Sequence, residues 1–317
     1  MDNHLFTKAY NKIKQSENIL IVAHEKPDGD AVSSACAMAE LLTLINKKFT
    51  IFTADTPASQ FDYLPHVEKF INHLDRFDYD LIIALDCANK KRTSLSNFIE
   101  NKKSNQYIIE IDHHIQEDDY ADLTIREDDA ASTTQVLYKF IKANKIKINK
   151  NIANCILTGI ITDTANFFYP NTSPETINIA SKLMARGAKL PQIVEKTWRN
   201  KSLAAMKIWG KAMSRLTINP KYNFATTLLT EEDLGKDIND DDLEGIAGFL
   251  SNLHDVKGLM LLREDKNGWL RGSLRTADPK INISKVAQTL GGGGHIKAAG
   301  FKLKGKIQET TNGWKII

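Results

Sequence analysis

The chain has 317 residues, of which 42% are hydrophobic and 26% are charged, and its formal net charge is +3. This length and composition are typical of a globular protein with up to two domains, and the small net charge argues against a general polyanion binder. No run approaches 18 apolar residues and the first twenty residues contain no apolar signal segment, so we expect a cytoplasmic protein without a membrane span.

The first half of the chain reads as alternating strands and helices. An amphipathic pattern predicts a helix near the N-terminus, and the apolar runs at 19–23, 49–53, 81–85 and 108–111 are typical of buried strands. Segments of helical length separate these runs and predict right-handed crossovers in a mostly parallel sheet, with helices on both faces. A further helix is expected at 132–143, whereas periodicity alone does not assign the apolar segment 152–162. The sequence Ser173-Pro174-Glu175 predicts another helix start.

The last third of the chain has a different pattern. Strand candidates at 225–229, 258–262 and 269–275 surround a helix beginning near Asp240, Asn267-Gly268 is a hairpin signal, and a second helix is expected over 283–290. Residues 257–317 hold twelve Lys or Arg against four Asp or Glu. We therefore predict an α/β protein with an N-terminal domain over 1–190, a helical linker over 191–214 and a smaller, basic α/β domain over 215–317.

Acidic and histidine side chains recur where the predicted elements of the first domain end. His24 follows the first strand, Asp86 follows the third, and Asp112-His113-His114 ends the fourth. Because the carboxyl ends of parallel strands meet at one edge of a sheet, we expect these groups to converge. The candidate metal ligands are His24, Asp28, Asp30, Asp86, His113 and Asp163.

Each of these residues has an ordinary structural explanation when taken alone, such as a turn, a helix cap or a polar strand end. Together, carboxylates with a few imidazoles suit Mn²⁺ or Mg²⁺. Six ligands exceed the need of one ion but suffice for two when one carboxylate bridges, and such a pair activates water for in-line attack on phosphorus. Cys36, Cys87 and Cys155 lie far apart in apolar segments, so thiolate ligation is not expected.

Two features of the C-terminal domain could bind an anionic substrate. Arg271, Ser273 and Arg275 alternate along one predicted strand and therefore share a face, where guanidinium groups can bind phosphate. The run Gly291–Gly294 can present successive backbone amides to a phosphate. Solvated arginines and a flexible turn are the alternatives, and Trp269 on the same face could either stack on a base or pack in the core.

The ordered set of motifs resembles the DHH phosphoesterase superfamily. The matching motifs are His24-x-x-Pro27-Asp28-Gly29-Asp30, Asp86, Asp112-His113-His114, Thr162-Asp163 and Gly291-Gly292-Gly293-Gly294-His295. Within this superfamily, the chain length and the following Ala298-Ala299-Gly300 resemble the bifunctional nanoRNase (oligoribonuclease) and pAp phosphatase group. The resemblance implies a two-cation hydrolase, with Mn²⁺ favoured and Mg²⁺ or Co²⁺ as alternatives, acting on short RNA oligonucleotides and pAp.

The resemblance also implies roles for individual residues. One ion would be bound by His24, Asp28 and Asp86, and the second by Asp30, Asp163, His113 and a bridging Asp86. The catalytic residues would be His114, which contacts the scissile phosphate or assists protonation of the leaving group, and Asp112, which orients its neighbours. The C-terminal domain would supply substrate contacts, implied at Arg271, Ser273, Arg275, Gly293, Gly294 and His295.

Two departures from the group leave substrate preference open. The group usually carries a glycine and an arginine after the aspartate that corresponds to Asp163, whereas this chain reads Thr164-Ala165-Asn166-Phe167, and its tail after Gly300 is short. The alternatives are a RecJ-type single-strand exonuclease, a linear dinucleotide phosphodiesterase, a pyrophosphatase, and a nucleotide sensor without catalysis. The sequence does not decide whether the subunits pair as a homodimer.

Overall fold

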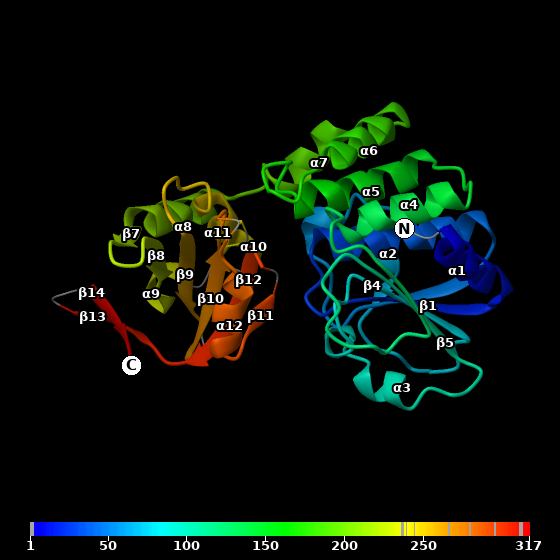
Figure 1. Ribbon diagram of the computed structural model, residues 1–317, viewed down its shortest axis with the longest axis horizontal. Helices are drawn as coiled ribbons and strands as arrows, with labels where there is room; N and C mark the ends of the chain where they lie inside the picture. Colours follow the sequence, from blue (N-terminus) through cyan, green and yellow to red (C-terminus); the bar gives the residue numbers. More distant parts are fainter. Residues whose placement is uncertain are drawn as a thin grey trace. The chain divides into compact units, whose positions relative to one another are not determined.

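The computed structural model describes residues 3–235, 238, 240–243, 245–265, 267–278, 280–294, 296–310 and 313–317. The chain divides into two compact units, Met1–Asn200 and Lys201–Ile317. The two units are visible in Figure 1, where the first runs from blue to green and the second from green to red. No helix in the described part of the chain is both long and apolar enough to cross a membrane.

A six-stranded parallel sheet forms the centre of the first unit. Its strands are β1 (Asn18–Ala23), β2 (Lys48–Phe52), β3 (Phe70–Ile71), β4 (Leu81–Leu85), β5 (Tyr107–Asp112) and β6 (Leu123–Arg126), in the spatial order β3-β2-β1-β4-β5-β6. All five pairings are parallel. The predicted α/β class and parallel sheet are confirmed, while β3 and β6 were not predicted.

Helices cover both faces of this sheet, and the alternation of apolar residues along the strands explains why. Ile19 and Ile21 of β1 point into one core, whereas Leu20 and Val22 point into a second core on the opposite face. Figure 1 shows α2, α4 and α5 together over one face and α3 on the other. The helices are α1 (Asn3–Gln15), α2 (Gly29–Leu44), α3 (Ser96–Glu100), α4 (Thr133–Ala143), α5 (Lys150–Asp163), α6 (Pro174–Ala185) and α7 (Leu190–Thr197), with short 3₁₀ turns at Ser59–Phe61, Val67–Lys69 and Lys91–Thr93.

The apolar segment that periodicity left unassigned is helix α5, which packs closely against α2. A Cβ atom on Gly159 would lie 2.3 Å from Asp30 Oδ1, and one on Gly29 would lie 2.4 Å from a methyl group of Thr162. Only glycine permits this approach of the two backbones. The first turn of α2 therefore lies beside the last turn of α5.

The second unit is built on a mixed sheet of order β11-β12-β10-β9-β8-β7, in which only the β8–β9 pair is parallel among the described strands. Apolar clusters lie on both of its faces, one under α8 and α11 and the other under α12. The strands are β7 (Thr217–Asn219), β8 (Phe224–Leu229), β9 (Gly258–Glu264), β10 (Trp269–Arg275), β11 (Gly293–Gly294) and β12 (Ala298–Lys304), followed by the hairpin β13 (Ile307–Thr310) and β14 (Gly313–Ile316). The helices are α8 (Leu203–Ser214), α9 (Glu231–Leu234), α10 (Asp240–Leu243), α11 (Ile246–Leu250) and α12 (Ile283–Thr289).

The predicted linker over 191–214 contains most of α7 and all of α8, and the chain is not helical between Trp198 and Ser202. The predicted hairpin signal at Asn267-Gly268 lies between β9 and β10, which pair antiparallel. Gly268 has a φ of +71°, a conformation that glycine adopts without strain.

Candidate metal centre

The candidate ligands of the first unit converge at the carboxyl ends of the central strands. The strand order of the sheet reverses between β1 and β4, and in parallel sheets ligands bind at such a switch point. His24 directly follows β1, and Asp86 directly follows β4. The fold therefore explains why residues more than 60 positions apart lie side by side.

Three side chains form the first group. Ligand atoms of His24, Asp28 and Asp86 all lie within 4.8 Å of one another. His24 Nε2 is 3.8 Å from Asp28 Oδ2 and 3.7 Å from Asp86 Oδ2. It is buried and has no hydrogen-bond partner among the residues that the structure describes. The other ring nitrogen, Nδ1, lies 2.6 Å from the carbonyl oxygen of Glu25, to which it donates in the neutral tautomer that leaves the Nε2 lone pair aimed at the two carboxylates.

A second group joins Asp30, His113 and Asp163, whose ligand atoms also lie within 4.8 Å of one another. Asp30 is in the first turn of α2, while Asp163 is the last residue of α5. His113 Nε2 is 3.3 Å from Asp163 Oδ2. The close packing of α2 on α5 therefore brings two carboxylates from distant parts of the chain to the same histidine.

Asp86 lies between the two groups. Its Oδ2 faces His24, while its Oδ1 is 3.6 Å from His113 Nε2 and accepts a hydrogen bond of 2.8 Å from the Thr133 hydroxyl. Asp86 is 1% exposed and has a φ of +61°, which is unusual for a residue other than glycine. This strained backbone at the end of β4 directs one carboxylate toward both groups, as a bridging ligand requires.

Asp30 is held by the amino end of helix α4. Its Oδ2 accepts from the Thr133 amide at 2.5 Å, and its Oδ1 accepts from the Thr134 amide and hydroxyl at 3.1 and 2.8 Å. The positive end of the helix favours a carboxylate here. Thr133 and Thr134 were not predicted as site residues, because Ser132-Thr133-Thr134 reads in the sequence as an ordinary helix cap.

The crowding of carboxylates opposes their ionisation. Burial, and then the charges of Asp86 and Asp28, raise the pKa of Asp30 well above its ordinary value. Burial and the charge of Asp30 likewise raise the pKa of Asp163. A divalent cation would remove this repulsion, so the donor set and its electrostatics fit the predicted metal ions.

The pKa values of the two adjacent histidines, His113 and His114, are shifted in opposite directions. Burial lowers the pKa of His113, which favours the neutral ring that a metal ligand requires. Burial also opposes protonation of His114, but its hydrogen bonds to Asp112 and Asp86 outweigh this and raise its pKa to about 11. His114 Nδ1 is 2.8 Å from Asp112 Oδ1 and 3.4 Å from Asp86 Oδ1. His114 is therefore suited to contact a phosphate as a cation or to donate a proton.

Asp112 organises the two loops that carry these groups. Its Oδ1 accepts from the amides of His113 and His114 at 2.7 and 2.8 Å, and its Oδ2 accepts from the amide of Ala88 at 2.7 Å. Asp112 is fully buried. One carboxylate thus ties the loop after β4, where Asp86 and Ala88 have positive φ, to the loop after β5.

Arg126 of β6 is a positioning residue that sequence reasoning missed. Its guanidinium donates to the carbonyl oxygens of His114 at 2.7 Å and Ala88 at 3.2 Å, and to Glu110 Oε1 at 2.6 Å. A single arginine on a short edge strand has no distinguishing sequence signal, because its role depends on strands that pair only in the folded sheet.

We expect Arg126→Lys to lower kcat about tenfold and the free energy of unfolding by about 1–2 kcal/mol. Lysine keeps the charge beside Glu110 but cannot reach three acceptors in one plane. Steady-state kinetics and urea denaturation would check both numbers. Lys139→Arg is a suitable control, since it alters an ion pair with Glu127 and Glu175 without changing its charge.

Bound divalent cations should raise the melting temperature by about 5 °C or more. The raised pKa values of Asp30 and Asp163 mean that the folded chain binds more protons than the unfolded chain above about pH 4. Without metal, stability contributed by these groups is therefore lost as pH rises from there toward the folded pKa values. Thermal melts in EDTA and in MnCl₂ should differ more at pH 8 than at pH 5.5, and equal shifts would contradict this reading.

The predicted substrate contacts of the second unit lie on β10 and β11. Arg271, Ser273 and Arg275 occupy alternate positions of β10 and are half-buried, while their neighbours in the strand are buried. Gly293 pairs with Gly300 of β12, and a Cβ atom on Gly293 would meet nothing within 4 Å. Gly294 pairs with Ala299 and has a φ of +133°. His295 lies outside the described residues.

The sequence after Asp163 forms a compact left-handed turn. Ala165, Asn166 and Phe167 have φ values of +47°, +63° and +69°. The Asn166 amide donates to the carbonyl oxygen of Ile161 at 2.8 Å, and Phe167 packs against the main core of the unit. Core packing therefore accounts for Phe167.

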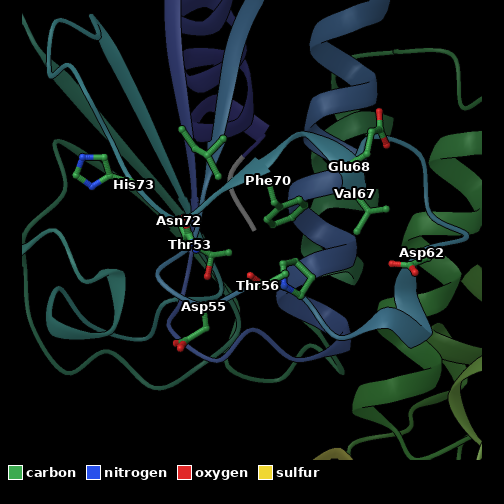
Figure 2. Close-up of a pocket in the computed structure, with 11 residues that line it drawn as sticks. Thr53, Asp55, Thr56, Asp62, Val67, Glu68, Phe70, Asn72 and His73 are labelled. Carbon is green, nitrogen blue, oxygen red and sulfur yellow. The ribbon is translucent and has the colours of Figure 1, made fainter.

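A surface hollow of about 680 Å³ lies beside the metal centre, near the ends of β2 and β3. The hydroxyl of Thr53 donates to the carbonyl oxygen of His24, and Asp55 accepts from the amide of Lys26, so this wall supports the loop that carries the first ligands. Figure 2 shows the lining side chains, among them Thr53, Asp55, Thr56, Asp62, Val67, Glu68, Phe70, Asn72 and His73. None of the candidate ligands lines this hollow.

Comparison with protein families agrees with this arrangement. The N-terminal domain of the DHH family matches residues 18–160, which span β1 to most of α5, and the DHHA1 domain matches residues 221–312. The chain belongs to the DHH family. It is a phosphoesterase, and therefore a hydrolase, as the predicted family implied. The DHH sequence motif itself is Asp112-His113-His114 at the end of β5.

Several relatives of this DHH protein are similar over most of their length. The bifunctional oligoribonuclease and PAP phosphatase NrnA of Thermus thermophilus is 28% identical, with 90% of this chain and 84% of that protein covered. NrnA of Bacillus subtilis is 26% identical, with 94% and 93% covered. The crystal structure of an exopolyphosphatase-related protein from Bacteroides fragilis superposes with a TM-score of 0.87 at 26% identity, covering 96% of this chain and 92% of that one.

Proposed function

We propose that this phosphoesterase hydrolyses short RNA oligonucleotides to mononucleotides and pAp to AMP and phosphate, using two divalent cations of which Mn²⁺ is favoured. The observation that carries the proposal is the pair of ligand groups with Asp86 between them, 3.7 Å from His24 on one side and 3.6 Å from His113 on the other. Support for the substrates comes from relatives named as oligoribonuclease and PAP phosphatase over nearly the whole chain.

The proposed ligands are His24, Asp28 and Asp86 for one cation and Asp30, His113 and Asp163 for the other. Asp86, whose Oδ1 is 3.6 Å from His113 Nε2, would bridge the two. Two cations in such a site lower the pKa of water and offset the charge on the attacking and leaving oxygens of a phosphate. The imidazoles of His24 and His113 and the carboxylate of Asp86 fit hard-to-borderline ions.

The remaining residues would either contact the substrate or hold the ligand-bearing loops in position. His114, held in its protonated form by Asp112, would contact a non-bridging oxygen of the scissile phosphate or pass its proton to the leaving oxygen. Asp112 and Arg126 would fix the loops that carry Asp86 and His113-His114. In the second unit, Arg271, Ser273, Arg275, the Gly293-Gly294 amides and His295 would bind the terminal nucleotide.

A substrate panel with purified enzyme and MnCl₂ tests the proposal. We expect turnover of pAp and of RNA two to five nucleotides long, and at least tenfold lower kcat/KM for long single strands. Preference for long single strands would favour a RecJ-type exonuclease instead. Exclusive turnover of linear dinucleotides would favour a dinucleotide phosphodiesterase, phosphate release from pyrophosphate a pyrophosphatase, and binding without turnover a sensor.

A further inference from the structure

The hollow at the ends of β2 and β3 adjoins the loop that carries the first ligand group. Its Thr53 hydroxyl donates to the carbonyl oxygen of His24 at 2.9 Å, and its Asp55 accepts from the amide of Lys26 at 2.8 Å. Strand β2 pairs with β1, and β3 pairs with β2, so their ends lie about 5 and 10 Å across the sheet from the end of β1. The hollow is therefore within reach of a nucleoside whose phosphate lies at the first ligand group.

Apolar side chains in the hollow offer a surface for a flat ring. Figure 2 shows Phe70 amid the lining side chains, between Thr53 and Val67. Phe70 and Val67 pack against the main core but are only half-buried, so part of each side chain faces the hollow. Bases of any sequence stack on aromatic rings. The volume of about 680 Å³ also falls within the range of about 300–1,000 Å³ that is usual for small-molecule sites.

The charged groups of the hollow disfavour a phosphate. Asp55, Asp62 and Glu68 line it, and the described residues around it include no Lys or Arg. The imidazole of His73 is the one lining group that can become positive, and it lies 3.5 Å from Asp75. Carboxylates accept hydrogen bonds from the amino groups of bases. An uncharged base with an amino group therefore fits this lining better than a phosphate does.

Two neutral polar side chains complete the lining. Thr56 supplies a hydroxyl group and Asn72 an amide group, and both residues are exposed. Neither side chain makes a hydrogen bond within the described part of the chain. Both can donate and accept, so they are available to the polar edge of a base.

We propose that this hollow binds the base of the nucleotide that lies across the scissile phosphate from the terminal nucleotide of a short RNA, with a preference for bases that carry an amino group. The inference rests on the proposed function. Phe70 stacks on the base, while Thr56, Asn72 and the carboxylates contact its polar edge. A pAp molecule has no nucleoside beyond the phosphate that is released, so its hydrolysis does not use the hollow.

Phe70→Leu in the full-length enzyme tests the stacking contact. Leucine keeps an apolar side chain against the core but removes the aromatic face. We expect the ratio of kcat/KM for a three-nucleotide RNA of adenosines to kcat/KM for pAp, both with MnCl₂, to fall about fivefold. Phe77→Leu is the matched control, because Phe77 is also a partly exposed aromatic residue of the first unit but packs against Phe98, outside the hollow. It should leave the ratio unchanged.

Thr56→Trp tests the hollow without changing a core contact. Thr56 is exposed, so a bulky side chain there fills the hollow and leaves the packing of Phe70 against the core intact. The same ratio should fall at least fivefold, since the base is excluded. A ratio that stays at the wild-type value in both Phe70→Leu and Thr56→Trp would overturn the base site.

A binding measurement separates this inference from the proposed activity. Adenosine carries no phosphate, so its binding in EDTA depends neither on cations nor on turnover. Saturation-transfer NMR should show stronger transfer to adenosine than to uridine with the wild-type enzyme, and at least twofold weaker transfer to adenosine with Phe70→Leu and Thr56→Trp.

The outcomes of the two experiments are distinct. Equal transfer to adenosine by wild type and both variants would overturn the base site, and stronger transfer to uridine would overturn the preference for an amino group. Wild-type enzyme that binds adenosine through Phe70 but cleaves neither the RNA nor pAp would overturn the proposed function and leave a base site standing.

Discussion

Asp86→Ala should lower kcat about a thousandfold or more on both pAp and short RNA, without unfolding the chain. Asp86 is the only residue described here whose two carboxylate oxygens face different ligand groups, so its loss weakens both proposed cation sites together. A lost metal accounts for several kcal/mol of transition-state stabilisation. Mn²⁺-dependent turnover by the purified variant would contradict the bridging role.

The stability of Asp86→Ala provides an internal control. The charge of Asp86 raises the pKa of Asp30 and of Asp163, so its removal relieves repulsion in the metal-free protein. In EDTA the variant should therefore melt no more than about 2 °C below wild type. In MnCl₂ the variant should lack most of the rise in melting temperature that wild type shows. Differential scanning fluorimetry measures the melting temperature under both conditions.

Asp112→Asn should reduce activity and stability together, with kcat lowered about a hundredfold and the free energy of unfolding by about 3 kcal/mol. The carboxylate accepts from the amides of Ala88, His113 and His114, and an amide group in either orientation would set its own donor against one of these buried N–H groups. It would also release His114, whose raised pKa depends first on the hydrogen bond to Asp112.

Chemical denaturation and the pH dependence of kcat check this second prediction. Asp118→Asn is a useful comparison, because Asp118 also accepts a backbone hydrogen bond, from the amide of Lys90, but is outside the ligand groups. Its effect should be below about 1 kcal/mol, with kcat unchanged. Equal effects of the two substitutions would show that Asp112 has only an ordinary role in capping a loop.

The sequence predicted the sheet well because its strands are buried on both faces. Continuous apolar runs such as Leu81–Leu85 identify such strands, and polar residues placed directly after them indicate one common edge. The order of the strands was not predictable in this way. Only the folded sheet shows that the reversal of order lies between β1 and β4, where His24 and Asp86 meet.

The residues that sequence analysis missed depend on contacts between distant segments. Strand β6 has four residues and its pattern is too short to identify, so the role of Arg126 was not visible. Thr133 and Thr134 read as part of a helix cap, and their contacts with Asp30 arise only because α4 begins beside α2. Both cases are tertiary effects that local periodicity does not record.

Anomalous diffraction at the manganese edge, from crystals grown with MnCl₂, tests the central claim most directly. We expect two peaks, one among His24, Asp28 and Asp86 and the other among Asp30, His113 and Asp163, both within coordination distance of an Asp86 oxygen. A crystal of active enzyme with no peak near Asp86, or with one ion that Asp86 does not touch, would contradict the two-cation centre.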